Sequence, residues 1–308
     1  MTTAVYQDPT FDDDRRRQEL YAGNVVVYSR RPSVQALVDF ARSLLVEAFA
    51  PLPPLTAQHE MSVEKFAEIL GVLKPRFIHH DESKRLLKNL LEDLGCDPEQ
   101  TYFDVPRLRS STSDGYLTTG MAYAWHPHRD TWYSAPPCQL NWWFPVYETT
   151  ADNCMAFHPR YFAEGVENDS AGYNYYEWNR VHRGAHVARL TKQDARPLPR
   201  ATQPLAREPE LRLVVPVGGI MLFSGGQMHS SVPNTSGVTR YSIDFRTIHL
   251  TDAASKRGAP NVDSHCTGTT MRDYLRMTDL SRVPDAVVGV YDDGSAERGE
   301  VVYRPDAS

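Results

Sequence analysis

The sequence WHPHRDTWYS, at residues 125–134, places two histidines and an aspartate at alternating positions: His126, His128 and Asp130. In an extended strand every second side chain points to the same face, so a strand here makes these three polar groups converge. A polar row of this kind is also typical of the solvated face of an edge strand. The rest of the chain has to distinguish a metal site from a solvated face.

Short β-like segments, separated by Pro, Gly, Ser or Asn, fill most of residues 101–250. This texture is typical of an all-β barrel or a jelly roll. A polar stretch rich in Arg and Pro interrupts it at residues 163–208, and long insertions of this type often act as lids. We predict strands at residues 101–109, 120–130, 138–148, 154–159, 211–217, 219–225, 228–233 and 240–250.

Residues 30–100 instead show the helical spacing of apolar side chains, with a stripe of leucines near their end. Such stripes are typical of helices that pack against a core. Three helices are expected, which begin at Ser33, Ser62 and Asp81, with Pro51 ending the first and Gly95 the third. We predict one domain over residues 1–308: a helical layer at 30–100, a β core at 101–250 with the insertion 163–208, and a C-terminal extension at 251–308 with one short helix near 269–279.

The composition is that of an ordinary soluble globular protein, with 41% apolar and 23% charged residues among 308. A net charge of −6 argues against a nucleic-acid or anionic-membrane partner. The sequence lacks the roughly 20-residue apolar run of a membrane span, and its start lacks the apolar core of a secretory signal. Its four cysteines have no metal-binding spacing, so we expect reduced thiols and a cytoplasmic location. The oligomeric state is not predicted.

A second histidine from a distant segment completes a candidate metal site. His128 and Asp130 form an H-x-D pair, and the segment at residues 223–245, FSGGQMHSSVPNTSGVTRYSIDF, supplies His229. Two His nitrogens and one carboxylate oxygen leave about three positions open on a metal, as in non-haem Fe(II) oxygenases. We therefore predict His128, Asp130 and His229 as metal ligands.

An arginine and a serine lie close after His229 in the sequence. A buried Arg240 near a metal needs an anion, and the distal carboxylate of 2-oxoglutarate suits the fork of a guanidinium. Ser231, two residues after His229, faces the same side of its strand and can donate to the same carboxylate. Gln139 shares a face with Asn141 and is a further candidate for contact with the cosubstrate.

These residues resemble the phytanoyl-CoA dioxygenase-like branch of the Fe(II)/2-oxoglutarate-dependent oxygenases. The resemblance covers about residues 105–250, while residues 160–162 and Gly219 depart from that family's pattern on the substrate side. The matching positions are the H-x-D pair His128 and Asp130, the H-x-S-x-x-N run His229, Ser231 and Asn234, and Arg240.

The resemblance implies a double-stranded β-helix that holds Fe(II) at one mouth. It implies that 2-oxoglutarate binds the iron, with Arg240 and Ser231 on its far carboxylate, and that O2 is consumed while succinate and CO2 are released. The expected reaction is hydroxylation, or desaturation or cyclisation, of a small-molecule intermediate of specialised biosynthesis. Because Asp130 occupies the position that halogenases leave open for chloride, halogenation is disfavoured.

The candidate substrate residues are mostly aromatic, which favours a mid-sized and partly apolar substrate. Each also has a structural interpretation: a rim histidine, core packing of a large aromatic side chain, or an arginine that pairs with an aspartate. The candidates are Tyr123, His126, Trp132, Trp142, Trp143 and Arg246.

Three alternatives remain open. A cupin-like oxygenase that needs no 2-oxoglutarate would use His126 as a ligand, but the glutamate expected about four residues after His128 is absent. A zinc hydrolase accepts the same three ligands, yet it gives Arg240 no role. A jelly-roll module that binds a ligand without catalysis has no reason to keep a cluster of buried ionisable groups.

Overall fold

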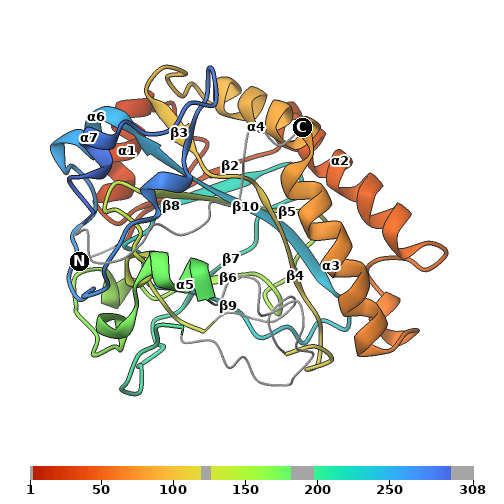
Figure 1. Cartoon of the computed structure of the whole chain (residues 1–308). Coiled ribbons are helices and arrows are strands. Elements are labelled where there is room, and N and C mark those ends of the chain that lie inside the picture. The colour runs from red at the N-terminus through yellow and green to blue at the C-terminus, as the bar shows by residue number, and fades with distance from the viewer. Residues whose placement is uncertain (1–2, 119–125, 182–197, 293–308) are drawn as a thin grey trace.

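The computed structural model describes residues 3–118, 126–181 and 198–292. Their strands form two sheets that face each other (Figure 1). The larger sheet has eight strands in the order β1-β2-β8-β5-β10-β3-β11, with β4 also paired to β10, and the smaller sheet has the order β7-β6-β9. Helices α2, α3 and α4 cover the far side of the larger sheet (Figure 1). This arrangement confirms the predicted jelly-roll class with an N-terminal helical layer, although no closed barrel forms among the described strands.

The helices are α1 (Asp13–Tyr21), α2 (Pro32–Phe49), α3 (Val63–His79), α4 (Asp81–Asp93), α5 (Tyr175–Val181), α6 (Leu250–Ser255) and α7 (Asp285–Val288). The strands of the larger sheet are β1 (Val5–Gln7), β2 (Val25–Tyr28), β3 (Thr101–Phe103), β4 (Arg107–Ser111), β5 (Leu140–Pro145), β8 (Ile220–Ser224), β10 (Arg240–His249) and β11 (Leu275–Arg276). Those of the smaller sheet are β6 (Met155–Phe157), β7 (Leu211–Leu213) and β9 (His229–Ser231).

The central strands of the larger sheet bury both faces, and alternate residues belong to two different cores. On β10 the side chains of Tyr241, Ile243 and Phe245 join the large core beneath the helices. On β5 the neighbours Trp142 and Trp143 divide in the same way, because successive side chains of a strand point to opposite faces. The smaller core between the two sheets consists of Val25, Val27, Trp143, Met155, Phe157, Val215, Met221 and Phe223.

The two faces of β10 differ in polarity: apolar side chains face the helices, and polar side chains face the smaller sheet. Arg240, Ser242 and Asp244 lie on this face because they alternate with the core residues of the same strand. The antiparallel register places Ser242 opposite Arg109 on β4. The fold thus keeps a charged surface between the two sheets, next to an apolar core.

The ends of the helices agree only in part with the sequence prediction. Ser62 caps α3 as expected, since its side chain accepts a hydrogen bond from the Lys65 amide. The prediction that Ser33 caps α2 is wrong, because Pro32 already occupies the first turn and the Ser33 hydroxyl donates to Asp93 instead. α4 begins at Asp81 as predicted, and His80 before it caps the helix, since its ring nitrogen accepts from the Glu82 amide.

Three further segments differ from the prediction. Of the strand expected at 120–130, residues 119–125 lie outside the described part, and a 3-10 helix at Asp130–Tyr133 replaces its end. The helix expected near 269–279 is a 3-10 turn at Thr270–Asp273 followed by β11. The N-terminal residues, for which no strand was predicted, add β1 and β2 to the edge of the larger sheet.

The remaining predictions on domain organisation stay predictions. The insertion 163–208 contains α5, while its residues 182–197 lie outside the described part. In the ranges that the structure describes, we find no helix that combines the length and the apolar character needed to cross a bilayer.

Candidate metal centre

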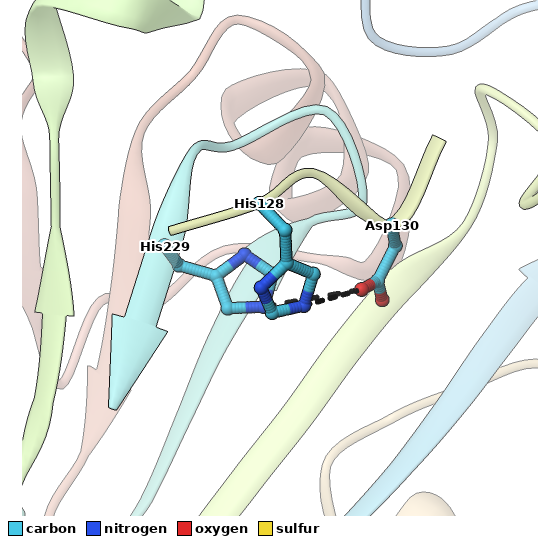
Figure 2. A group of neighbouring side chains, drawn as sticks. All are labelled: His128, Asp130 and His229. Atoms are coloured by element: carbon cyan, nitrogen blue, oxygen red, sulfur yellow. Dashed lines mark ion pairs between the residues drawn. The ribbon is translucent and has the colours of Figure 1, made fainter. Parts of the chain in front are cut away.

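The three predicted metal ligands meet between the sheets although the sequence separates them. His229 is the first residue of β9, His128 pairs with it in a single antiparallel bridge, and Asp130 begins the 3-10 helix that follows. One ligand atom from each residue lies within 4.8 Å of the other two, and all three residues are buried. Figure 2 shows the two imidazole rings side by side, facing the Asp130 carboxylate.

Main-chain hydrogen bonds hold the two histidines in register. The His128 amide donates to the His229 carbonyl over 3.0 Å, and the His229 amide donates back over 2.9 Å. Their ring centroids are therefore only 4.4 Å apart. The Asp130 amide donates to the Gly225 carbonyl over 2.9 Å, which ties the third ligand to the turn that precedes β9.

The orientation of each ring leaves one nitrogen for a metal. His128 Nδ1 lies 2.8 Å from the His126 carbonyl oxygen, and His229 Nδ1 lies 2.9 Å from the Gln227 carbonyl oxygen. A carbonyl only accepts, so each Nδ1 carries the proton and each Nε2 has a free electron pair. These Nε2 atoms lie 3.5 Å and 3.9 Å from Asp130 Oδ1. Such outer hydrogen bonds are typical of metal-binding histidines.

The protonation states suit a metal at neutral pH. Burial, together with the neighbouring His128, lowers the pKa of His229 to about 4. Burial alone would raise the pKa of Asp130, but its hydrogen bond to His128 and the charge of Arg246 hold that pKa well below its usual range. Metal ligands must be neutral histidines and an ionised carboxylate, and the electrostatics of the site favour both for His229 and Asp130.

The second oxygen of Asp130 is held by the protein. Gln139 Nε2 donates to Asp130 Oδ2 over 2.7 Å, and Arg246 Nε lies 3.8 Å from the same oxygen. Arg246 also approaches Asp104 at 3.2 Å and Asp244 at 3.6 Å. Gln139, predicted to contact the cosubstrate, thus contacts a metal ligand, and its predicted cosubstrate contact stays untested.

Arg240 is a buried cation without a carboxylate partner among the described residues. Its side chain donates to the carbonyls of Asn153 and Cys154 over 3.0 and 3.4 Å and to Ser231 Oγ over 3.3 Å. Its Nε has no hydrogen-bond partner within residues 3–118, 126–181 and 198–292, and the residue is only 5% exposed. Burial lowers the pKa of Arg240 to about 10, so the guanidinium stays charged at neutral pH. A buried cation in this state favours an anionic ligand.

The candidate substrate residues occupy different environments. His126 lies beside the centre, where its Nε2 is 3.0 Å from the Pro199 carbonyl and burial lowers its pKa to about 4. Trp143 faces the space between the sheets, with the Arg240 guanidinium 5.9 Å from its ring centre. Tyr123 lies outside the described residues.

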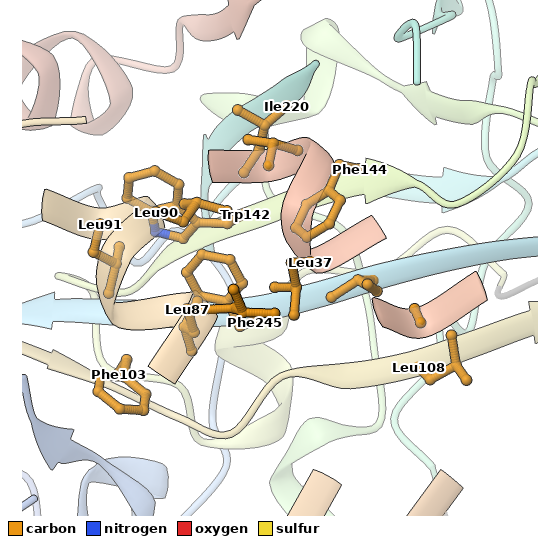
Figure 3. Close-up of a cluster of buried hydrophobic side chains, with 14 of the residues drawn as sticks. Leu37, Leu87, Leu90, Leu91, Phe103, Leu108, Trp142, Phe144, Ile220 and Phe245 are labelled. Carbon is orange, nitrogen blue, oxygen red and sulfur yellow. The ribbon is translucent and has the colours of Figure 1, made fainter. Parts of the chain in front are cut away.

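The other two tryptophans are packed away from this space. Trp142 belongs to the large core, where it stacks on Phe245 and donates to Thr247 over 2.8 Å (Figure 3). Trp132 is fully buried and donates to Asp263 over 2.7 Å. The predicted substrate roles of Trp132, Trp142 and Arg246 stay predictions.

One charged residue near the centre escaped the sequence analysis. Asp104 follows β3, and its side chain accepts from the Arg246 amide over 2.6 Å and pairs with the guanidiniums of Arg246 and Arg107. A single aspartate in a strand-rich segment carries no local signal. The place of Asp104 near the centre becomes evident only when β3 pairs with β10, which lies more than 130 residues later in the sequence.

The donor set can bind a divalent transition metal. Two neutral imidazoles and one carboxylate suit iron and zinc, and three protein ligands leave positions open for other molecules. Because the ligands are buried, the open coordination positions are less hydrated than bulk solvent. Charges at these positions therefore interact more strongly than they would in water.

No protein-family model matches this chain, and no curated protein matches it either. Its fold resembles several solved structures at low identity. EvdO2 from Micromonospora carbonacea var. aurantiaca, solved with 2-oxoglutarate, is 13% identical over 78% of this chain and 92% of its own, with a TM-score of 0.43. AviO1 from Streptomyces viridochromogenes Tue57 is 13% identical over 82% and 100%, with a TM-score of 0.39. The epimerase SnoN, solved with Fe3+, alpha ketoglutarate and nogalamycin RO, is 14% identical over 78% and 86%, with a TM-score of 0.39.

Proposed function

We propose that this protein is a non-haem Fe(II)- and 2-oxoglutarate-dependent oxygenase that acts on a small molecule. The observation that carries the proposal is the combination of two sites on one inner surface. One is the buried His–Asp–His triad, and the other is Arg240, which contacts Ser231 two residues beyond His229 and which no carboxylate of the described residues neutralises. The first site fits iron and the second fits a carboxylate of the cosubstrate.

The triad would hold the iron through His128 Nε2, His229 Nε2 and Asp130 Oδ1. When bound, iron and 2-oxoglutarate supply the oxidation of a C–H bond by O2, with succinate and CO2 as co-products. The protein itself fixes both ring orientations and keeps Asp130 ionised, as the hydrogen bonds to the His126 and Gln227 carbonyls and the charge of Arg246 indicate.

Arg240 and Ser231 would hold the far carboxylate of the cosubstrate. Ser231 lies two residues beyond His229 on the same face of β9, which corresponds to about 6.6 Å along a strand. A second hydroxyl, that of Ser242, is fully buried on the inner face of β10 and has no hydrogen-bond partner in the described part of the chain. A buried hydroxyl without a partner is costly, so Ser242 is a further donor for this anion.

The substrate side of the centre is charged. Arg109 pairs with Asp244 through two hydrogen bonds of 2.5 and 3.2 Å, and Arg246 lies between Asp244 and Asp130. The side chains of Arg109, Asp244 and Arg246 keep exposures of 35%, 17% and 23%, so solvent reaches the inner face. These groups favour a substrate with polar or charged substituents over a bare hydrocarbon.

The reaction type, the substrate class, the cellular location and the family branch are parts of the same proposal. We infer hydroxylation, desaturation or cyclisation of an intermediate of specialised biosynthesis, without a nucleic-acid or membrane partner and in the cytoplasm. The phytanoyl-CoA dioxygenase-like branch is supported by the spacing of His229, Ser231 and Arg240.

Anaerobic visible spectroscopy tests the proposal. Wild-type protein that binds Fe(II) should develop a weak charge-transfer band when 2-oxoglutarate is added. His229→Ala should lose the band, and Arg240→Gln should need far more 2-oxoglutarate to reach it. Arg212→Gln is the matched control, because Arg212 is an exposed arginine at the edge of the smaller sheet. Iron binding without the band would overturn the cosubstrate assignment and favour the cupin-like alternative.

A further inference from the structure

The C-terminal extension contacts the metal centre through a tyrosine. Tyr274 lies between the 3-10 turn at Thr270–Asp273 and β11, and it is only 1% exposed. Its hydroxyl donates to Gln139 Oε1 over 2.7 Å, and Gln139 Nε2 donates to Asp130 Oδ2 over 2.7 Å. We propose that Tyr274 is a positioning residue of the metal centre, which acts through the Gln139 amide to determine which oxygen Asp130 offers to the metal.

The proposal follows from the two ends of the Gln139 amide. An amide can rotate so that its oxygen and nitrogen exchange places, and its partners select the orientation. Tyr274 donates to the oxygen, and the nitrogen then donates to both Asp130 Oδ2 and Asn141 Oδ1, the latter over 2.9 Å. The reverse orientation would turn an amide oxygen toward two acceptor oxygens. Burial raises the pKa of Tyr274 well above its usual value, so the hydroxyl keeps the proton that it donates.

This chain of hydrogen bonds gives the two oxygens of the Asp130 carboxylate different surroundings. Oδ2 is occupied by Gln139 and faces Arg246, while Oδ1 faces the Nε2 atoms of His128 and His229. Only Oδ1 is thus available to a metal. A ligand that binds through one oxygen leaves more positions open than one that binds through two, which matters in a centre that must accept further molecules.

Other contacts from the extension fix the segment that carries Asp130. Asp263 accepts from Arg129 Nε over 3.0 Å and from Trp132 Nε1 over 2.7 Å, on either side of the ligand. Ser264 Oγ donates to the Thr131 carbonyl over 2.6 Å. This segment belongs to no strand, and its main-chain links to the sheets include the His128–His229 bridge and the bond from the Asp130 amide to the Gly225 carbonyl. The extension adds side-chain restraints on both sides of the ligand.

The inference rests on the metal part of the proposed function and not on its cosubstrate. The test compares Tyr274→Phe, which removes one hydroxyl, with Tyr241→Phe. Tyr241 is equally buried, and its hydroxyl donates to the Pro54 carbonyl over 3.2 Å, among the core residues beneath the helices. For each protein we would measure the dissociation constant for Co(II), the visible spectrum of the Co(II) form and the thermal unfolding temperature.

We expect Tyr274→Phe to weaken Co(II) binding about tenfold, within the range found for groups that orient metal ligands. Its Co(II) spectrum should change, since a released carboxylate alters the coordination, whereas Tyr241→Phe should bind Co(II) like the wild type with an unchanged spectrum. An unchanged spectrum and affinity in folded Tyr274→Phe would overturn the inference. Equal losses of affinity in both variants would also overturn it, because they would reflect general destabilisation.

The outcomes separate this inference from the proposed function. Wild-type protein that binds metal but shows no 2-oxoglutarate band would refute the cosubstrate while the Co(II) comparison still decides the role of Tyr274. Wild-type protein that takes up no metal would overturn both. Gln139→Met provides a second variant, which should reproduce the spectral change of Tyr274→Phe if the hydroxyl acts through the amide.

Discussion

Arg240 Nη2 lies 3.3 Å from Ser231 Oγ on the inner surface of the protein, and no ion pair neutralises this guanidinium among the described residues. A charge buried in this way destabilises the fold until an anion binds beside it. The pair therefore links the stability of the protein to the presence of an anion, which we propose is 2-oxoglutarate.

Arg240→Gln should greatly reduce the stabilisation by a given concentration of 2-oxoglutarate while it leaves the ligand-free fold nearly unchanged. Loss of the hydrogen bonds to the Asn153 and Cys154 carbonyls is offset by removal of a buried charge. In the wild type with iron, 2-oxoglutarate at about 100 times its dissociation constant should add about 2.7 kcal/mol to the free energy of unfolding. Urea unfolding with and without 2-oxoglutarate measures both effects. An equal gain in the variant would contradict the assignment of Arg240.

Gly258→Ala should destabilise the protein by about 1–3 kcal/mol, as overpacking against the main chain does. A Cβ at Gly258 would lie 2.3 Å from the Pro137 carbonyl carbon and 2.6 Å from the Cys138 nitrogen. Both are backbone atoms, so one main-chain segment has to shift against the other. Gly172→Ala is the control, because a Cβ there meets no atom within 4 Å. Equal unfolding temperatures for the two variants would show that the 137–138 segment yields freely.

His158 should make the protein less stable as the pH falls below neutrality. Burial lowers the pKa of His158 below its usual 6.5, and its Nε2 lies 3.1 Å from Ser230 Oγ. The unfolded chain takes up a proton near pH 6.5, whereas the folded protein keeps this ring neutral until a lower pH. Over that interval the unfolded state binds more protons, so the free energy of unfolding decreases as the pH decreases.

His158→Gln should therefore flatten the dependence of stability on pH between about 7 and 5. Urea unfolding of metal-free protein at several pH values measures the slope. His79→Gln, a change at an exposed histidine at the end of α3, should keep the wild-type slope. A slope in His158→Gln as steep as that of the wild type would assign the effect to other groups.

Leu87→Ala should cost about 2–5 kcal/mol of unfolding free energy, because it leaves a cavity between α4 and the larger sheet. Leu87 is fully buried in the large core. Val72→Ala on α3 removes apolar atoms from a residue that is 70% exposed and should change stability by less than about 0.5 kcal/mol. Thermal unfolding of both variants tests whether the helical layer is an integral part of the fold, and equal small effects would mean that it is not.

Local patterns in the sequence predict much of this structure. The alternation in β10 separates core from polar residues, and the leucine stripe of α4 marks its buried face. The spacing of His128 and Asp130 predicts two metal ligands because it matches a known donor set, although a 3-10 helix, and not a strand, carries Asp130. The prediction of that strand failed since alternation in a short segment does not require extended backbone.

Contacts between distant segments could not be predicted. Tyr274 and Asp263 approach the centre from a loop-rich extension, and no periodicity marks either residue. Asp104 likewise acquires its role only when β3 and β10 become neighbours. Single polar residues of this kind depend on tertiary structure alone.

The position of β2 within the larger sheet has a consequence for biosynthesis. Val26 pairs with Leu222, which the ribosome adds 196 residues later. The apolar run Val25–Tyr28 thus emerges long before its neighbour exists, and pairing over such a distance slows folding. Until β8 is synthesised, one edge of this apolar strand has no pairing partner and is prone to aggregation. Molecular chaperones that shield such edges should therefore raise the yield of native protein.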